Sequence, residues 1–228
     1  MSVWLLVFLL FSPIRQVDSI RLHFSPPPSQ VLTDYETHNY KQTVIHEGGE
    51  VYSEIRSLNF LEINLNFRIF RDTDYLRRQH PLVRRLIDQY PVETINLREF
   101  LQHTARFLEE EIRYVDGDYP QDAAAVLFAK KANCIGYSNL LSVLLHAVGV
   151  ENKLVKGFYL RRVGFRQWIP VPHRWVEIRL ANGRRYFYDP QYHTFSSQYV
   201  VVRDDTDFTK VKKFKVSLIK QSREMVNQ

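Results

Sequence analysis

The fold is decided by residues 130–149, which read KKANCIGYSNLLSVLLHAVG and contain the only cysteine of the chain, Cys134. Beyond that cysteine the segment is apolar on nearly every side, which is typical of a helix buried at the centre of a domain. We expect Asn133 to be the N-cap of this helix. Gly149 is expected to end it, because glycine readily takes the left-handed conformation of a helix terminus. The thiol is therefore predicted to lie in the first helical turn.

A single cysteine excludes an intramolecular disulfide framework and a cysteine-based zinc cluster. The residues alone leave two interpretations open, a buried structural thiol and a reactive thiol. The N-terminal end of a helix carries partial positive charge, which favours a thiolate. A nucleophilic thiolate also needs a base, and the base needs a group that orients it.

His173 and Asp189 are the candidates for these two roles. His173 begins an alternating strand, HRWVEIRL (173–180), and Asp189 ends the next one, RYFYDP (185–190). A two-residue turn at 182–183 would place the two side chains on opposite faces of the sheet. A three-residue loop at 181–183, with Gly183 left-handed, places Asp189 opposite Trp175 and diagonal to His173 on the same face. A catalytic pair therefore predicts the three-residue loop.

The remaining patterns predict an α+β protein. Residues 39–58 form two extended runs around Gly48 and Gly49, which predicts a hairpin, and LEINLNFRI (61–69) alternates strictly, which predicts a half-buried strand. Apolar residues recur at helical spacing in 72–90 and 96–114, with Asn96 as a candidate N-cap. Further strands are expected over 152–163, 198–202 and 212–220.

The chain has 228 residues, a formal charge of +6 and 45% hydrophobic residues, which suits one domain with a small extension. Its Lys and Arg residues are spread out rather than blocked, so no nucleic-acid partner is expected. Residues 3–11 are an unbroken apolar run, shorter than the roughly 20 residues of a spanning helix. This run predicts a signal peptide cleaved after Ser19, and hence a secreted or periplasmic protein. The alternatives are an uncleaved membrane anchor and a first strand, the latter with a cytoplasmic location.

Residues 95–192 resemble the transglutaminase-like superfamily, in its bacterial form. The family pattern has a cysteine that starts an apolar helix ending in glycine, then a strand with glycine, His-x-Trp-Val-Glu, and Asp-Pro. The matching residues here are Cys134, Gly149, Gly157, His173, Trp175, Val176, Glu177, Asp189 and Pro190. The resemblance implies a papain-like core, in which a central helix bearing the cysteine packs on an antiparallel sheet. It also implies a Cys134–His173–Asp189 triad that acts on amides.

Three positions depart from the family pattern. The glycine usually found two residues before the cysteine is Ala132, the following residue is Ile135 rather than the Trp of animal transglutaminases, and Asn139 lies where members vary. These departures leave the triad intact and put the second oxyanion donor in doubt, beside the backbone N–H of Cys134. The candidates for that donor and for the substrate cleft are Gln121, Asn133, Trp175, Tyr188 and His193.

These observations predict four parts of the chain: an N-terminal hydrophobic segment (1–19), a β-rich region (20–70), a transglutaminase-like domain (71–220) and a polar tail (221–228). The predicted function is thiol-dependent acyl transfer or hydrolysis at amide bonds through a thioester, without cofactor or metal. The expected substrate is a peptide or protein, with cell-wall peptides among the candidates. The competing hypotheses are a catalytically silent peptide-binding module and acyl transfer to an arylamine, although no coenzyme A signature is present. A membrane contact is expected only if residues 1–19 stay attached.

Overall fold

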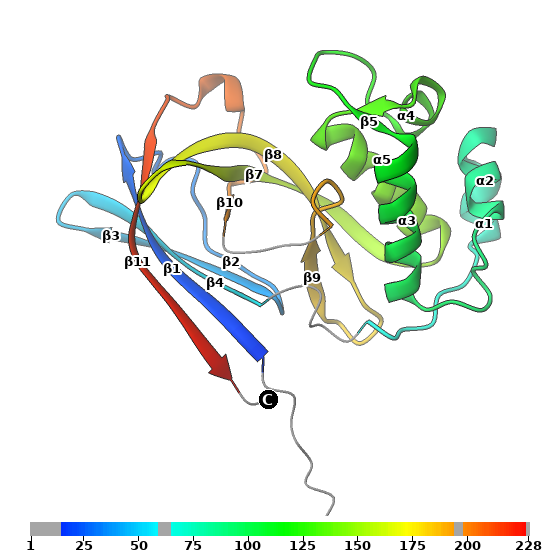
Figure 1. The fold of residues 1–228 in the computed structure, drawn as a ribbon, viewed down its shortest axis with the longest axis horizontal. Helices are drawn as coiled ribbons and strands as arrows, with labels where there is room; N and C mark the ends of the chain where they lie inside the picture. The colour runs from blue at the N-terminus through cyan, green and yellow to red at the C-terminus, as the bar shows by residue number, and fades with distance from the viewer. Residues whose placement is uncertain (1–14, 59–64, 194–197, 227–228) are drawn as a thin grey trace, which may run out of the picture.

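The computed structural model describes residues 15–58, 65–193 and 198–226, and consists of a long curved sheet with a cluster of helices packed against one end (Figure 1). In chain order the strands are β1 (Arg15–Ser25), β2 (Tyr35–Glu36), β3 (Tyr40–Glu47), β4 (Glu50–Leu58), β5 (Arg113–Tyr114), β6 (Lys131–Ala132), β7 (Glu151–Gly164), β8 (Gln167–Arg179), β9 (Arg185–Tyr188), β10 (Tyr199–Val201) and β11 (Lys215–Val226). The helices are α1 (Thr73–Arg77), α2 (Pro81–Asp88), α3 (Leu97–Glu111), α4 (Ala123–Ala129), α5 (Cys134–Ala147) and the short 3-10 helix η2 (Phe208–Lys210).

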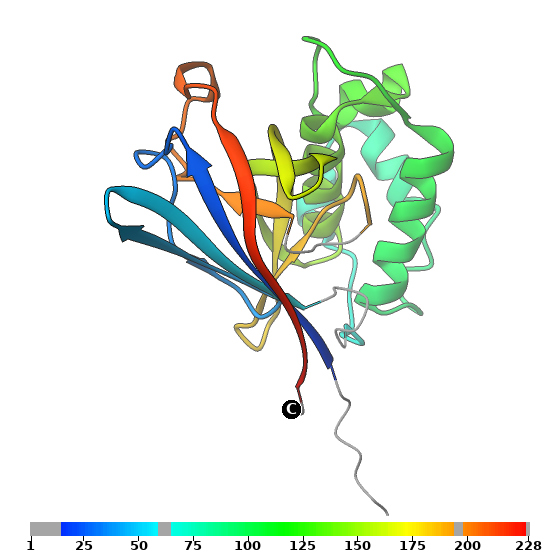
Figure 2. The ribbon, with the colours of Figure 1, turned by 60° about the vertical axis from the view of Figure 1, so that its left-hand side comes forward.

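The sheet runs in the order β10-β7-β8-β11-β1-β4-β3-β2, and β9 pairs with a further part of β8. The long β7–β8 hairpin links the two halves of the molecule, because its tip pairs with β11 and its base packs on α5 (Figure 2). The prediction of a mixed helix and sheet protein with a β-rich N-terminal region and a cysteine-bearing central helix is confirmed.

Two hydrophobic cores lie on opposite faces of β8. Val176 and Ile178 face α5 and join the core of the helical part. Trp175, the residue before Val176, faces the N-terminal strands and joins a second core with residues of β1 and β10. Strand alternation alone produces this division, because successive side chains point to opposite faces.

Polar side chains of the N-terminal region complete the edges of β9 and β10. The Asn39 side chain accepts from the backbone N–H of Phe187 and donates to its carbonyl, at 2.8 and 2.9 Å. The Gln42 side chain likewise accepts from the Val201 N–H at 2.9 Å and donates to the Val201 carbonyl at 2.8 Å. Both side chains are buried, so they take the place of a neighbouring strand where none pairs. The β-rich region expected over 20–70 is therefore joined to the rest of the sheet rather than a separate lobe.

The C-terminal end differs from the sequence prediction. Residues 221–228 were expected to be a polar tail, but Gln221 to Val226 continue β11 and pair with the first half of β1. No alternation marks this extension, because Gln221, Ser222 and Arg223 are all polar, and its partner lies about 200 positions earlier in the chain. The expected cleavage point also falls within β1, where Ser19 pairs with Arg56 and Ser222. Residues 1–14 lie outside the described part of the chain.

The strand expected over 61–69 is a second difference. Residues 61–64 lie outside the described residues, and 65–69 form only an isolated bridge between Arg68 and Asn96. The alternation itself is real, since Leu65 and Ile69 are both buried. The segment does not pair along its length because the carbonyls of Leu65 and Phe67 accept from the first N–H groups of α3.

The helix predicted over 96–114 is observed as α3, whereas the helical segment predicted over 72–90 is divided into two helices. Asn96 caps α3 in a capping box with Glu99. The segment 72–90 contains two helices, α1 and α2, because Pro81 disfavours helical backbone at the residue before it and starts a new helix. Helix α4 was not predicted. Among the described residues, no helix is both long and apolar enough to cross a membrane.

Candidate active site

Cys134 is the first residue of α5, as predicted. Asn133 caps the helix, and its side-chain oxygen accepts from the Ile135 N–H at 2.9 Å. The Ser138 hydroxyl, one turn later, donates to the backbone carbonyl of Arg174 at 2.9 Å and so holds this end of α5 against β8. The thiol is partly exposed, and the backbone N–H at this helical position has no intrahelical acceptor.

The hairpin between β8 and β9 has the three-residue loop that a His–Asp pair requires. Arg179 pairs with Arg185 and Val176 with Tyr188, and Gly183 has φ +79°. This register continues past the paired residues and brings Asp189 to the face of His173. The imidazole Nε2 lies 2.7 Å from Asp189 Oδ2. Sequence reasoning thus predicted both the loop and the contact.

Three groups hold the Asp189 carboxylate, which is fully buried. Besides His173, the Tyr199 hydroxyl donates to Oδ2 at 2.6 Å, and the Gln191 N–H donates to Oδ1 at 2.9 Å. A carboxylate fixed in this way can determine the orientation of the imidazole and its tautomer. Because Nε2 faces Asp189, the other ring nitrogen, Nδ1, is the one available to the thiol.

The pKa of His173 reflects both neighbours. Burial alone lowers it, but the hydrogen bond to Asp189, hydrogen bonding with Cys134 and the negative charges of both groups outweigh burial and raise the pKa to about 9. The imidazole is therefore protonated at neutral pH whenever the thiol carries its charge. A thiolate beside an imidazolium is the reactive form of a cysteine nucleophile.

Aromatic rings surround the imidazole on the remaining sides. The ring centroids of Tyr159, Tyr192, Tyr199 and Trp175 lie 5.9–6.3 Å from that of His173. Trp175 shares the His173 face as expected, but its exposure is 0%, so it is a core residue and not a wall of the cleft. A side chain at Gly157 would collide with Trp175 and with the Val200 carbonyl, which explains the glycine at this motif position.

Two of the other predicted cleft residues lie beside Cys134. The Gln121 Oε1 accepts from the Asn133 N–H at 3.2 Å, and Gln121 Nε2 is buried with no hydrogen-bond partner among the described residues. A side chain at Gly136, two residues after the cysteine, would overlap Gln121 Oε1. The absence of a side chain there makes room for the Gln121 amide at the start of α5.

Tyr188 and His193 lie elsewhere. They line a cavity of about 90 Å³ next to Leu65 and Leu101 in the helical part. Tyr188 precedes Asp189 by one residue, so its side chain points to the opposite face of the sheet, toward α5 and α3. The prediction that these two residues line the substrate cleft is therefore not supported by their positions.

The structure adds residues that the sequence did not single out. Tyr114 of β5 pairs with Ala132 of β6, and Ala132 is two residues before the cysteine. Its pKa is raised by burial first, then by its hydrogen bond to Asp116 and by the charge of Cys134. Tyr192 lies against the His173 ring, with the two ring centroids 6.0 Å apart. No local sequence pattern marks either tyrosine, because only the tertiary fold brings them near Cys134.

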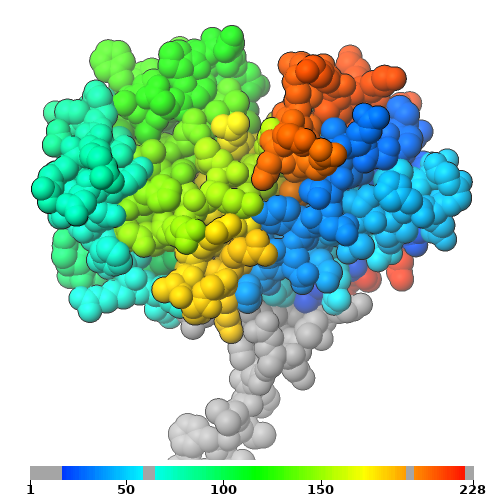
Figure 3. All heavy atoms as spheres, turned by 180° about the vertical axis from the view of Figure 1, so that it is seen from behind, coloured from blue at the N-terminus to red at the C-terminus, as the bar shows by residue number. Residues whose placement is uncertain are grey.

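A pocket of about 340 Å³ opens beside the thiol. It is lined by Cys134, Ile135, Lys156, Pro172, His173, Arg174 and residues 206–209. The last four belong to the connection between β10 and β11, which stands apart from the green helical part as an orange projection, with a notch between them (Figure 3). Cys134 is therefore open to solvent along this side.

Residues 84–190 match the model of the transglutaminase-like superfamily. That span includes Cys134, His173 and Asp189, and residues 84–190 of this chain belong to the transglutaminase-like superfamily. None of the curated proteins matches the chain.

Two solved structures are similar to this chain over most of its length. One is a "putative cysteine protease" from Cytophaga hutchinsonii, with 10% identity, a TM-score of 0.47, and coverage of 94% of this chain and 91% of the other. The second is the periplasmic domain of TgpA from Pseudomonas aeruginosa, with 11% identity, a TM-score of 0.44, and coverage of 80% and 88%. Because both TM-scores are below 0.5, these likenesses add nothing to the argument for the site.

Proposed function

We propose that this protein is a thiol acyl-transfer enzyme that acts on amide bonds of peptides or proteins. The observation that carries the proposal is the position of His173, which contacts Cys134 on one side and the buried Asp189 carboxylate on the other. A catalytically silent module does not need an imidazolium held beside its only thiol.

In the first step the Cys134 thiolate attacks the amide carbonyl. The oxyanion accepts from the backbone N–H of Cys134. Gln121 Nε2 is the second donor in this proposal, because this nearby amide N–H₂ has no other partner in the part of the chain that the structure describes. The His173 imidazolium then gives its proton to the leaving amine, and a thioester forms on Cys134.

In the second step neutral His173 removes a proton from the acceptor, which attacks the thioester carbonyl. The C–S bond breaks, and the Cys134 thiolate and the His173 imidazolium are restored. Water as acceptor gives hydrolysis, and a primary amine gives transamidation. Asp189 keeps Nε2 protonated throughout, so that Nδ1 accepts and returns the transferred proton.

The proposal can be tested on the single thiol without knowing the substrate. We expect iodoacetamide to alkylate Cys134 rapidly at pH 6–7, and His173→Ala to slow the reaction at that pH by about tenfold or more, because the thiolate loses its counter-ion. Since the chain has one cysteine, intact mass reports only this site. His103→Ala, an exposed position on α3, is the matched control and should leave the rate unchanged.

A second experiment separates an enzyme from a reactive but inactive thiol. Ester and peptide acyl donors should give a mass increase equal to the acyl group on Cys134, which disappears with time as water hydrolyses the thioester, or on addition of an amine. An alkylation rate like that of free cysteine, with no effect of His173→Ala, would contradict the proposal and favour a catalytically silent binding module.

Export belongs to the same proposal and rests on the apolar run at 3–11. N-terminal sequencing of the protein isolated from its host, together with its distribution among cell fractions, tests this point. Recovery of the complete N-terminus in the cytoplasmic fraction would contradict export.

A further inference from the structure

The floor of the pocket beside Cys134 is formed by the β7–β8 ladder. Pro172 and Arg174 alternate with His173, so they project from the opposite face of β8. This is the face on which Val176 packs against the helical core. Lys156 lies directly opposite Arg174 in the ladder, so both cationic side chains project from the same face below the pocket.

Two like charges placed opposite each other on neighbouring strands reduce stability. Within the described parts of the chain, neither Lys156 nor Arg174 forms a salt bridge that would offset this cost. Lys156 instead donates from Nζ to the carbonyl of Thr206 at 2.7 Å, which ties the wall of the pocket to its floor. The Arg174 side chain has no hydrogen-bond partner or ion pair among the described residues, and its backbone carbonyl accepts from Ser138 at 2.9 Å.

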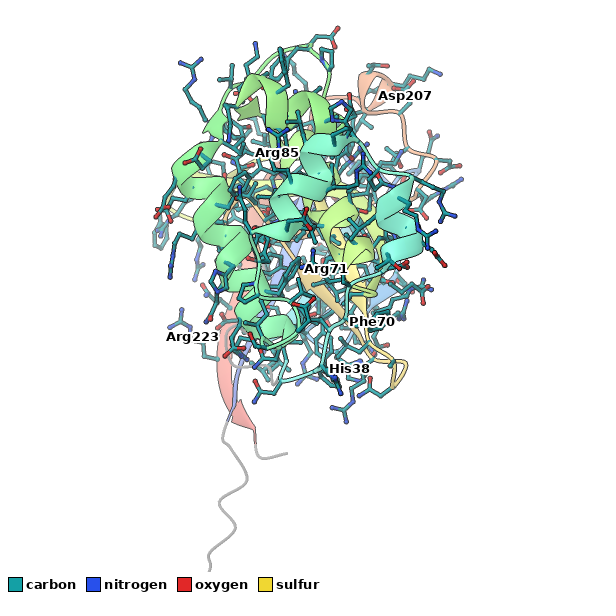
Figure 4. All side chains as sticks on the ribbon, turned by 90° about the vertical axis from the view of Figure 1, so that its right-hand side faces the viewer. His38, Phe70, Arg71, Arg85, Asp207 and Arg223 are labelled. Atoms are coloured by element: carbon teal, nitrogen blue, oxygen red, sulfur yellow. The ribbon has the colours of Figure 1, made fainter. Side chains whose placement is uncertain are left out.

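The opposite wall, residues 206–209, does not neutralise this charge. Asp207 is the only carboxylate among the described residues that line the pocket. Its Oδ1 accepts from the backbone N–H and the hydroxyl of Thr209, at 3.0 and 2.7 Å, and its Oδ2 pairs with Lys210 at 3.3 Å. Figure 4 shows Asp207 on the projecting segment, away from the centre of the fold. The pocket therefore keeps an excess of positive charge beside the nucleophile.

We propose that this pocket is a subsite for a carboxylate on the acyl donor, carried by an acidic residue next to the attacked amide, and that Arg174 selects it. This inference rests on the proposed function, because the pocket can select an acyl donor only if Cys134 is the nucleophile that attacks it. A guanidinium matches a carboxylate with two parallel hydrogen bonds. Ile135, Pro172 and Phe208 supply apolar surface for the methylene groups of such a side chain.

The first test compares two alkylating agents of nearly equal size, anionic iodoacetate and neutral iodoacetamide, on Cys134. We expect the rate of iodoacetate relative to that of iodoacetamide to fall roughly threefold to tenfold in Arg174→Gln. This is the range that one unit charge several ångströms away produces at a partly exposed site. Arg174→Lys should keep most of the ratio. Arg162→Gln removes the same charge six ladder positions away, near the hairpin tip, and should leave the ratio unchanged. An unchanged ratio in Arg174→Gln would overturn the proposal.

The second test uses peptide probes that carry an electrophile and differ only by Glu or Gln beside it. The Glu probe should label Cys134 faster, and the advantage should shrink in Arg174→Gln and at high salt. Equal labelling of the wild type by both probes would refute the acidic subsite while leaving the proposed chemistry intact. Slow labelling by every reagent, unaffected by His173→Ala, would instead refute the proposed function, so the two failures are distinguishable.

Discussion

Replacing Asp189 with asparagine removes one charge from the buried contact with His173 and leaves the volume of the side chain unchanged. In the wild-type protein His173 has a pKa of about 9 against an ordinary value of 6.5. One pKa unit corresponds to about 1.4 kcal/mol, so the charged imidazole is favoured in the folded state by roughly 3 kcal/mol. Burial opposes that charge, and the hydrogen bond to Asp189 is the largest contribution that raises the pKa.

We therefore expect Asp189→Asn to lower the pKa of His173 by about 2 units, within the range for loss of a neighbouring opposite charge. The stability should change with pH in a defined direction. Because the folded pKa lies above the unfolded one, the stabilisation by His173 is fully present below pH 6.5 and is lost as pH rises through about 9. The difference in free energy of unfolding between wild type and variant should therefore shrink by about 3 kcal/mol from pH 6 to pH 10.

The assay is urea unfolding of both proteins at several pH values, together with an NMR titration of the imidazole signals. Asp88→Asn, which removes an exposed carboxylate paired with Arg71 on the helical side, is the control and should give a difference that does not depend on pH in this window. The reasoning is refuted if the pKa of His173 in Asp189→Asn stays near 9, or if the stability difference is the same at pH 6 and pH 10.

Three further predictions concern other parts of the structure. Gln42→Ala leaves the Val201 N–H and carbonyl without their partners and should lower the free energy of unfolding by about 2–4 kcal/mol in urea, whereas exposed Gln89→Ala should cost less than about 0.5. Gly136→Ala should displace Gln121 and slow acylation of Cys134 by a peptide donor about tenfold or more, while alkylation by iodoacetamide changes little; equal losses in both reactions would indicate a general disruption instead. A chain that starts at residue 20 lacks the ladder from 15 to 19, and should unfold at a lower temperature than one that starts at residue 15, by several degrees; identical melting would mean that this half of β1 contributes nothing.

The features that the sequence determined are those set by neighbouring residues. Asn133 and Gly149 bound α5 because caps act within one helical turn. The loop at 181–183 sets the register of β8 and β9, and thereby the face of Asp189, because a hairpin needs only its own turn residues. For the same reason the contact between His173 and Asp189 could be predicted from the hairpin, whereas their approach to Cys134 depends on how α5 packs on β8.

The tertiary structure decided everything that depends on distant partners. Leu65 and Ile69 alternate as in a strand, yet the carbonyls of their segment accept from the first N–H groups of α3. The alternation could not predict this, because a period of two indicates which side chains are buried and not which groups the backbone bonds to. The pairing of β11 with β1 joins the two ends of the described chain, and no local pattern encodes a partner so far away. Tyr199, Lys156 and residues 206–209 reach the site in the same way, through strand neighbours that only the folded sheet defines. Side-chain alternation is a local property, whereas the choice of which strands and loops meet is a property of the whole packed chain.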